Sequence, residues 1–240
     1  MLTFTVFGHR GAMGYCPENT LFSFEQAIKM GVDAIELDVQ RCQTGELVVC
    51  HDRDISRTTD GQGFVDELSL TALQGFDAGQ WETIPTLREV LSLINRRVGV
   101  NIELKGPDVG FHVALLLHEL IEKEEWLASD FLVSSFDHPQ LEIFSKLAPQ
   151  VPLGVLVEGV PTILAACASA LSADALHVNA DFVNARLVDD AHEKGLLVYV
   201  WTINSPKELS RVLALSVDGV FTNYPDVIRK ALSAQISAVA

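Results

Sequence analysis

Short apolar runs alternate along the whole chain with segments whose apolar residues recur every three or four positions. The runs are typical of buried strands, and the periodic segments are typical of helices with one buried face, as at Leu21, Phe24 and Ile28. We therefore expect helices between strands at residues 3–8, 34–39, 98–104, 131–135, 153–157, 175–178, 196–201 and 219–222.

The residues at the ends of the periodic segments support these boundaries. Thr86 and Glu89 have the spacing of a capping box, and Gly31 and Gly195 stand where a glycine would end a helix. Eight strand–helix units in 240 residues predict an α/β fold, a (β/α)8 TIM barrel, with an open doubly wound sheet as the alternative. No glycine-rich GxGxxG segment follows the first strand, which weakens the dinucleotide-binding version of the open sheet.

One connection is longer than the others. Residues 53–83, after the second strand, are rich in Asp, Thr and Gly, and we expect a small insertion that extends over the active face. The alternative is a surface loop that packs only on itself. No linker, repeat or charge block divides the chain, so residues 1–240 are predicted to form a single domain.

Charge and composition disfavour several classes of binding partner. With 17 basic and 32 acidic residues the net charge is -15, which disfavours nucleic acid and anionic membranes as partners. No segment approaches the roughly 20 apolar residues that cross a bilayer, so we expect no stable membrane association. The four cysteines lack CxxC spacing and the N-terminus lacks a secretory pattern, which favours a cytoplasmic location. The sequence leaves the oligomeric state open, with a homodimer as one alternative.

Two of the predicted strands carry charged side chains on one face. In residues 35–39, Glu36 and Asp38 alternate with large aliphatic residues, so both carboxylates point into the barrel. In residues 100–105, Asn101, Glu103 and Lys105 share a face in the same way. Glu36, Asp38 and Glu103 would thus converge from two strands, and all-oxygen ligation indicates one divalent cation, Mg²⁺ or Ca²⁺. Without the cation, repulsion would push at least one carboxyl toward its protonated form.

Histidines follow two apolar runs, at His9 and at His51. Catalytic groups collect at the C-terminal ends of barrel strands, and two imidazoles can accept and donate protons near neutral pH, so these residues are the candidate acid and base. The remaining histidines lack such surroundings and are interpreted as structural: His112, His118, His138, His177 and His192.

Arg10 and Lys105 stand beside these groups and could hold a phosphate. Three carboxylates, a divalent cation and two basic side chains leave a formal charge of about +1, which balances a phosphodiester of charge -1. Without the cation the same groups would repel the substrate, so chelation should weaken binding as well as turnover.

At this point the chain resembles a known family, the glycerophosphodiester phosphodiesterases of the bacterial cytosolic type. The resemblance extends from His9 to Asp226 and rests on separate blocks in the right order: HRGAMGYCPENTLFSFEQAIKMGVDAIELDVQ, LVVCHD, RTTDGQG, NIELKG, SSFD, VWTIN and VDGVFTNYPD. It implies a TIM barrel with an insertion after the second strand, and metal-dependent hydrolysis of glycerophosphodiesters to an alcohol and sn-glycerol 3-phosphate.

Matched residue by residue, the resemblance places the family's catalytic histidines on His9 and His51. Its metal carboxylates fall on Glu36, Asp38 and Glu103, and its phosphate-contacting residues fall on Arg10 and Lys105. Trp201 resembles the family's aromatic wall for the glycerol. Glu18 and Asn19 fit the ENT block, which we interpret as positioning His9 and Arg10 and capping the first helix. Asn223 departs from the family pattern, where Asp is common.

Two other functions remain as alternatives. A phospholipase-type phosphodiesterase acting on intact lipid would need an apolar rim, for which the insertion offers only Phe64, Phe76 and Trp81. A non-catalytic phosphate-binding barrel would bind ligand without turnover, but the full set of histidines, carboxylates and basic residues argues against it.

Overall fold

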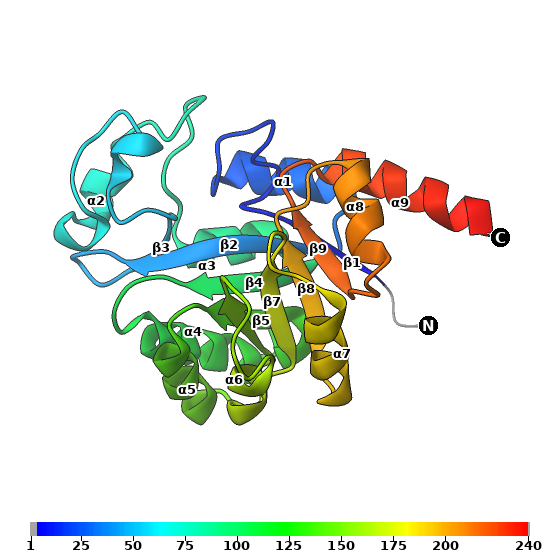
Figure 1. Ribbon diagram of the computed structural model, residues 1–240. Helices are drawn as coiled ribbons and strands as arrows, with labels where there is room; N and C mark the ends of the chain where they lie inside the picture. Colours follow the sequence, from blue (N-terminus) through cyan, green and yellow to red (C-terminus); the bar gives the residue numbers. More distant parts are fainter. Residues whose placement is uncertain (1–3, 240) are drawn as a thin grey trace.

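The computed structural model describes residues 4–239 and shows a closed barrel of parallel strands surrounded by helices (Figure 1). β1 pairs with both β9 and β2, which closes the ring. The barrel strands are β1 (Thr5–Gly8), β2 (Ala34–Arg41), β4 (Gly99–Leu104), β5 (Phe131–Ser135), β6 (Leu153–Val157), β7 (Ala175–Asn179), β8 (Leu197–Trp201) and β9 (Gly219–Thr222). The TIM barrel and its eight predicted strands are confirmed, except that residue 3 lies outside the described residues.

Helices on the outside connect successive barrel strands, and α9 follows the last one. They are α1 (Leu21–Lys29), α2 (Leu70–Leu73), α3 (Leu87–Ile94), α4 (Val109–Glu122), α5 (His138–Leu147), α6 (Ala166–Ala170), α7 (Ala185–Glu193), α8 (Pro206–Leu213) and α9 (Pro225–Val239). The capping box of Thr86 and Glu89 is present at α3, and Gly31 and Gly195 have positive φ just beyond α1 and α7. Among the described residues, no helix combines the length and apolar character needed to cross a membrane.

A short ninth strand, β3 (Leu47–Val49), runs antiparallel to β2, with Val49 opposite Val39. The sequence places His51 at the end of a barrel strand, and this is wrong because β3 lies outside the ring. β2 instead extends beyond the barrel rim to Arg41, the chain turns, and β3 returns alongside it. His51 therefore comes back to the level of Asp38, whose carbonyl accepts a hydrogen bond from the backbone N–H of Cys50.

The predicted insertion forms a lobe beyond the ends of β2 and β3 (Figure 1). It contains two 3₁₀ turns (Ile55–Arg57 and Val65–Glu67) and α2. Its buried residues pack against Val48 of β3, so the alternative of a loop that packs only on itself is wrong. A third 3₁₀ turn (Ala128–Asp130) precedes β5.

The barrel interior is divided into an apolar and a polar part. Phe7, Tyr199 and Phe221 pack together, and Phe7 stacks on Phe221 with ring centroids 4.5 Å apart. Ala34 belongs to this cluster and precedes Glu36 by two residues on the inward face of β2. The carboxylates thus stand above an apolar plug, toward the C-terminal end of the barrel.

Candidate active site

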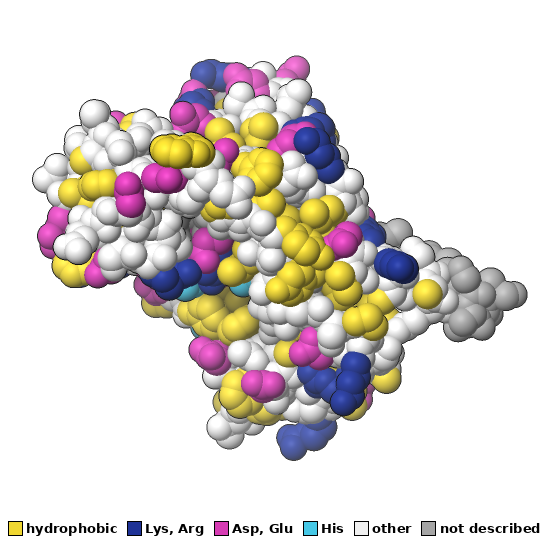
Figure 2. All heavy atoms as spheres, turned by 90° about the horizontal axis from the view of Figure 1, so that it is seen from above, with side chains coloured by type: hydrophobic (Ala, Val, Ile, Leu, Met, Phe, Trp, Pro, Cys, Tyr) yellow, Lys and Arg dark blue, Asp and Glu magenta, His cyan; other side chains and the backbone are white. Residues whose placement is uncertain are grey.

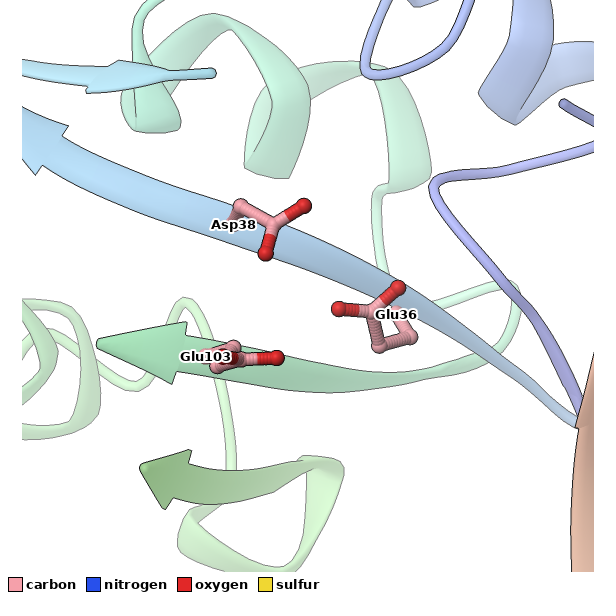
Figure 3. Close-up of side chains that lie close together, drawn as sticks. All are labelled: Glu36, Asp38 and Glu103. Carbon is pink, nitrogen blue, oxygen red and sulfur yellow. The ribbon is translucent and has the colours of Figure 1, made fainter. Parts of the chain in front are cut away.

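Three carboxylates meet inside the barrel mouth, as the alternation along the strands predicts. Glu36 and Asp38 project from β2 and Glu103 from β4, where Asp38 and Glu103 are paired in register. All three are buried, and one oxygen from each lies within 4.8 Å of the others (Figure 3). Such a separation leaves room for one ion between the three oxygens.

Hydrogen bonds orient these carboxylates from behind. The backbone N–H of Arg10 donates to Glu36 Oε2 (2.8 Å), and Asn19 Nδ2 donates to Asp38 Oδ2 (2.9 Å). Arg10 adopts a left-handed backbone conformation (φ 49°), which few non-glycine residues do. Asp38 Oδ1 is buried and accepts no hydrogen bond from the described residues; its charged partner is Lys105 Nζ, 3.6 Å away, so the oxygen keeps its capacity to bind a cation.

Two of the carboxylates, Glu36 and Glu103, have raised pKa values. Burial raises the pKa of Glu36 well above its usual range, and the charges of Asp38 and Glu103 raise it further. Burial and the charge of Asp38 raise the pKa of Glu103 to about 7, although Lys105 acts in the opposite direction. A cation between the three groups would remove this repulsion.

His9 follows β1 and is held from the far end of the chain. Its Nδ1 lies 2.7 Å from Asn223 Oδ1. Because an amide oxygen only accepts, Nδ1 carries the proton and Nε2 is left as an acceptor. Burial, together with the nearby positive charge of Arg10, lowers the pKa of His9 to about 4, so the ring is neutral at physiological pH.

His51 is oriented by its neighbour in sequence. Its Nδ1 lies 2.5 Å from Asp52 Oδ1, and its Nε2 lies 3.2 Å from Lys105 Nζ. Arg57, from the insertion, hydrogen-bonds the other oxygen of Asp52 and lowers the pKa of that carboxyl to about 2. The insertion thus helps to fix the orientation of the His51 ring.

Two basic side chains border the carboxylates. Lys105 Nζ lies 2.6 Å from Glu103 Oε1 and 3.6 Å from Asp38 Oδ1. Arg10 Nε lies 3.3 Å from Asp38 Oδ2, and Arg10 also pairs with Glu18 (2.7 Å). The positive charges are therefore fixed next to the proposed ion site, where an anionic substrate would meet them.

These groups line a single cavity at the mouth of the barrel. Figure 2 shows histidine and basic side chains in the hollow beside the insertion lobe. Every predicted site residue lines it except Asp38, which lies behind Arg10 and Lys105. Trp201 forms part of the wall and packs edge-on against Phe136, with centroids 5.6 Å apart. The lining comprises His9, Arg10, Glu36, His51, Asn101, Glu103, Lys105, Ser134, Phe136, Leu156, His177, Trp201 and Phe221.

Comparison with known proteins identifies the family. The model of the glycerophosphoryl diester phosphodiesterase family matches residues 9–227. The chain belongs to this family. A glycerophosphodiester phosphodiesterase of Bacillus altitudinis is 36% identical over 233 residues, which cover 92% of this chain and 95% of that protein. A glycerophosphodiester phosphodiesterase of Bacillus subtilis (strain 168) is 33% identical over 247 residues, which cover 92% of this chain and 84% of that protein.

A solved structure of an Oleispira antarctica phosphodiesterase, in complex with the product sn-glycerol-3-phosphate, superimposes with a TM-score of 0.89. Its sequence is 32% identical, and the match covers 95% of this chain and 96% of that one. The chain is therefore a phosphodiesterase in fold and in family, and its cavity is the candidate active site.

Several residues of this phosphodiesterase site were not assigned these positions from sequence. Asn19 does not cap the first helix, because Thr20 accepts the capping hydrogen bond from the backbone of Ser23; Asn19 instead binds Asp38. The sequence shows Asn223 only as a departure from the family pattern, whereas in the structure its side chain contacts His9. His9 and Asn223 are 214 positions apart, so no local sequence pattern predicts their contact. The inward position of Asn101, by contrast, follows from the alternation of polar and apolar residues along its strand.

Proposed function

We propose that the chain hydrolyses glycerophosphodiesters to an alcohol and sn-glycerol 3-phosphate with one divalent cation, Mg²⁺ or Ca²⁺, held by Glu36, Asp38 and Glu103. The observation that carries this proposal is the convergence of three buried carboxylate oxygens, which lie within 4.8 Å of one another beside the basic side chains of Arg10 and Lys105. A bound cation fits the absence of a hydrogen bond to Asp38 Oδ1 in the described residues and the raised pKa values of Glu36 and Glu103. When bound, the ion would supply positive charge to the phosphoryl oxygens.

Arg10 and Lys105 would bind the phosphodiester and neutralise the charge that builds up on its oxygens during the reaction. Both are already held in place by carboxylates, so little reorganisation is needed when the substrate enters. Glu18 supports this arrangement because it pairs with both Arg10 and Arg57.

The two histidines receive different roles from their surroundings. His9 is buried and neutral, with Nε2 unprotonated, and it would accept the proton of the nucleophile. His51 is partly exposed, and it would protonate the departing alkoxide. Because Lys105 Nζ, which only donates, faces His51 Nε2 in this structure, His51 would first take up a proton at Nε2 while Lys105 turns to the phosphate. The nucleophile is water or the neighbouring glycerol hydroxyl, and a cyclic phosphate detected by phosphorus NMR would identify the second route.

The reaction is tested with a panel of glycerophosphodiesters in the presence of EDTA, Mg²⁺ or Ca²⁺, with release of sn-glycerol 3-phosphate as the readout. We expect turnover only with a divalent cation, and a loss of about 10²- to 10⁴-fold in His9→Ala and His51→Ala. His118→Ala is the matched control, because His118 is exposed on α4 and pairs only with Glu122 among the described residues.

Other outcomes would favour the other functions. Activity on phospholipid vesicles but not on water-soluble diesters would favour the lipid enzyme, although only Trp81 is fully exposed at the insertion, while Phe76 packs against its core. Binding without turnover under both cations would favour the non-catalytic barrel. Near-full turnover of the two alanine variants would contradict the histidine assignment.

A further inference from the structure

The deepest polar wall of the active-site cavity contains groups that no part of the proposed reaction uses. His177 on β7 is completely buried, and neither ring nitrogen has a hydrogen-bond partner within the described part of the chain. Asn101 on β4 is also buried; its Nδ2 donates to Ser134 Oγ (3.1 Å), and its Oδ1 has no partner there. All three side chains line the same cavity.

The fold makes room for the His177 ring. Its ring contacts Tyr199 and Phe221, with centroids 5.5 Å and 5.1 Å apart. A Cβ at Gly154 of the neighbouring β6 would lie 2.4 Å from His177 Nε2, so only glycine fits beside the imidazole. The sequence predicts a structural role for His177, but a buried imidazole without hydrogen bonds from the described residues packs at a cost that an apolar ring would avoid.

Unpaired polar groups in a buried wall are costly, at about 1–3 kcal/mol each, unless a ligand or water satisfies them. Burial lowers the pKa of His177 to about 3, so the ring is neutral. Its Nε2 edge lies against Gly154, which leaves Nδ1 as the ring nitrogen available to a ligand. Asn101 Oδ1 adds an acceptor and the Ser134 hydroxyl adds a donor. This set carries no charge, and it matches hydroxyl groups rather than phosphate.

The charged and neutral groups of the cavity meet along β4. Asn101 pairs in register with Glu36 and Ser134 with Glu103, so this amide and this hydroxyl stand beside the carboxylates, whereas His177 on β7 belongs to another wall. Arg10, Lys105 and the carboxylates would take the phosphate. The neutral wall is enclosed, whereas Phe136 at the cavity is 42% exposed. The glycerol, which all glycerophosphodiesters share, fits the enclosed wall. The alcohol on the other side of the phosphate varies between substrates, and it fits the open side of the cavity near Phe136.

We propose that His177, Asn101 and Ser134 form a hydroxyl-binding subsite that holds the glycerol of the substrate and selects for it. This inference rests on the proposed function. His177 is then a specificity residue that touches the substrate without taking part in proton transfer.

The test compares two ligands, sn-glycerol 3-phosphate and n-propyl phosphate, which lacks both hydroxyls, by calorimetry with Mg²⁺ or Ca²⁺ present. Wild type should bind the glycerol compound more tightly, and His177→Phe should reduce that preference by about 5- to 20-fold while leaving propyl phosphate binding within about twofold. The melting temperature of the variant should not fall, because two unpaired nitrogens are removed. His177→Leu is the second variant, in case the larger ring disturbs the fold.

Tyr199→Phe is the matched control, since Tyr199 contacts His177 but does not line this cavity; it should keep the wild-type preference. An unchanged preference in both His177 variants, or an equal loss for both ligands, would overturn the subsite while leaving the proposed function in place. If wild type binds neither phosphate but releases sn-glycerol 3-phosphate from its substrates, the subsite fails and the proposed function stands; if it does neither, both fail.

Discussion

Asn223 Oδ1 lies 2.7 Å from His9 Nδ1, so a residue that follows the last barrel strand orients the imidazole that follows the first. A carboxylate in place of this amide would favour the protonated ring. Asn223→Asp should therefore raise the pKa of His9 from about 4 by about one unit or more.

Because neutral His9 is the proposed proton acceptor, activity is lost as the pH falls through its pKa. The acid limb of kcat/KM should move to higher pH in Asn223→Asp, with little change at pH 8. Asn184→Asp introduces the same charge at the N-cap of α7, outside the cavity, and should leave the profile unchanged. An identical acid limb in wild type and Asn223→Asp would refute the role of His9.

Gly11 allows the loop that carries His9 and Arg10 to approach α1. Its φ is +83°, and a Cβ there would lie 2.4 Å from Ser23 Oγ and 2.7 Å from the Ser23 backbone. Gly11→Ala should lower kcat/KM by about 10- to 100-fold, because it displaces the backbone N–H that orients Glu36. Steady-state kinetics would measure the loss in kcat/KM, and thermal melting would measure any accompanying loss of stability.

Gly31→Ala is a close control, since Gly31 has the same φ but a Cβ there meets nothing within 4 Å. It should cost only about 1 kcal/mol of stability and leave kcat/KM within about twofold. Equal kinetic effects of the two alanine variants would contradict the argument from the close approach.

Glu18 links Arg10 to Arg57 of the insertion. Although burial acts to raise its pKa, hydrogen bonds from the two arginines lower the pKa to about 2. A carboxyl whose pKa is depressed in the folded state stabilises the protein above its ordinary pKa of about 4.5, and this contribution is lost as the pH falls toward 2.

Glu18→Gln should therefore lower the free energy of unfolding at pH 7 by about 1–2 kcal/mol, after allowance for solvent screening, and have a smaller effect at pH 3. Urea denaturation at the two pH values measures this difference. A larger loss at pH 3 than at pH 7 would contradict the assignment.

The barrel and the carboxylate cluster could be predicted from sequence because both depend on local alternation. Glu36 and Asp38 are two residues apart on one strand, so their common face follows from strand geometry. The direction of β3 could not be predicted, since a three-residue strand pairs equally well either way until the turn before it is known. The partners Asn223 of His9 and Asn19 of Asp38 depend on tertiary packing, which no local pattern encodes.

Calorimetric titration of Mg²⁺ and Ca²⁺ into the wild-type protein tests whether Glu36, Asp38 and Glu103 hold one divalent cation. We predict binding of one ion per chain, accompanied by a rise in melting temperature with ion concentration. In Glu103→Gln the binding should weaken at least about 10- to 100-fold, whereas Glu122→Gln, on the exposed face of α4, should bind as wild type does. Absence of binding in wild type, or unchanged affinity in Glu103→Gln, would contradict the account.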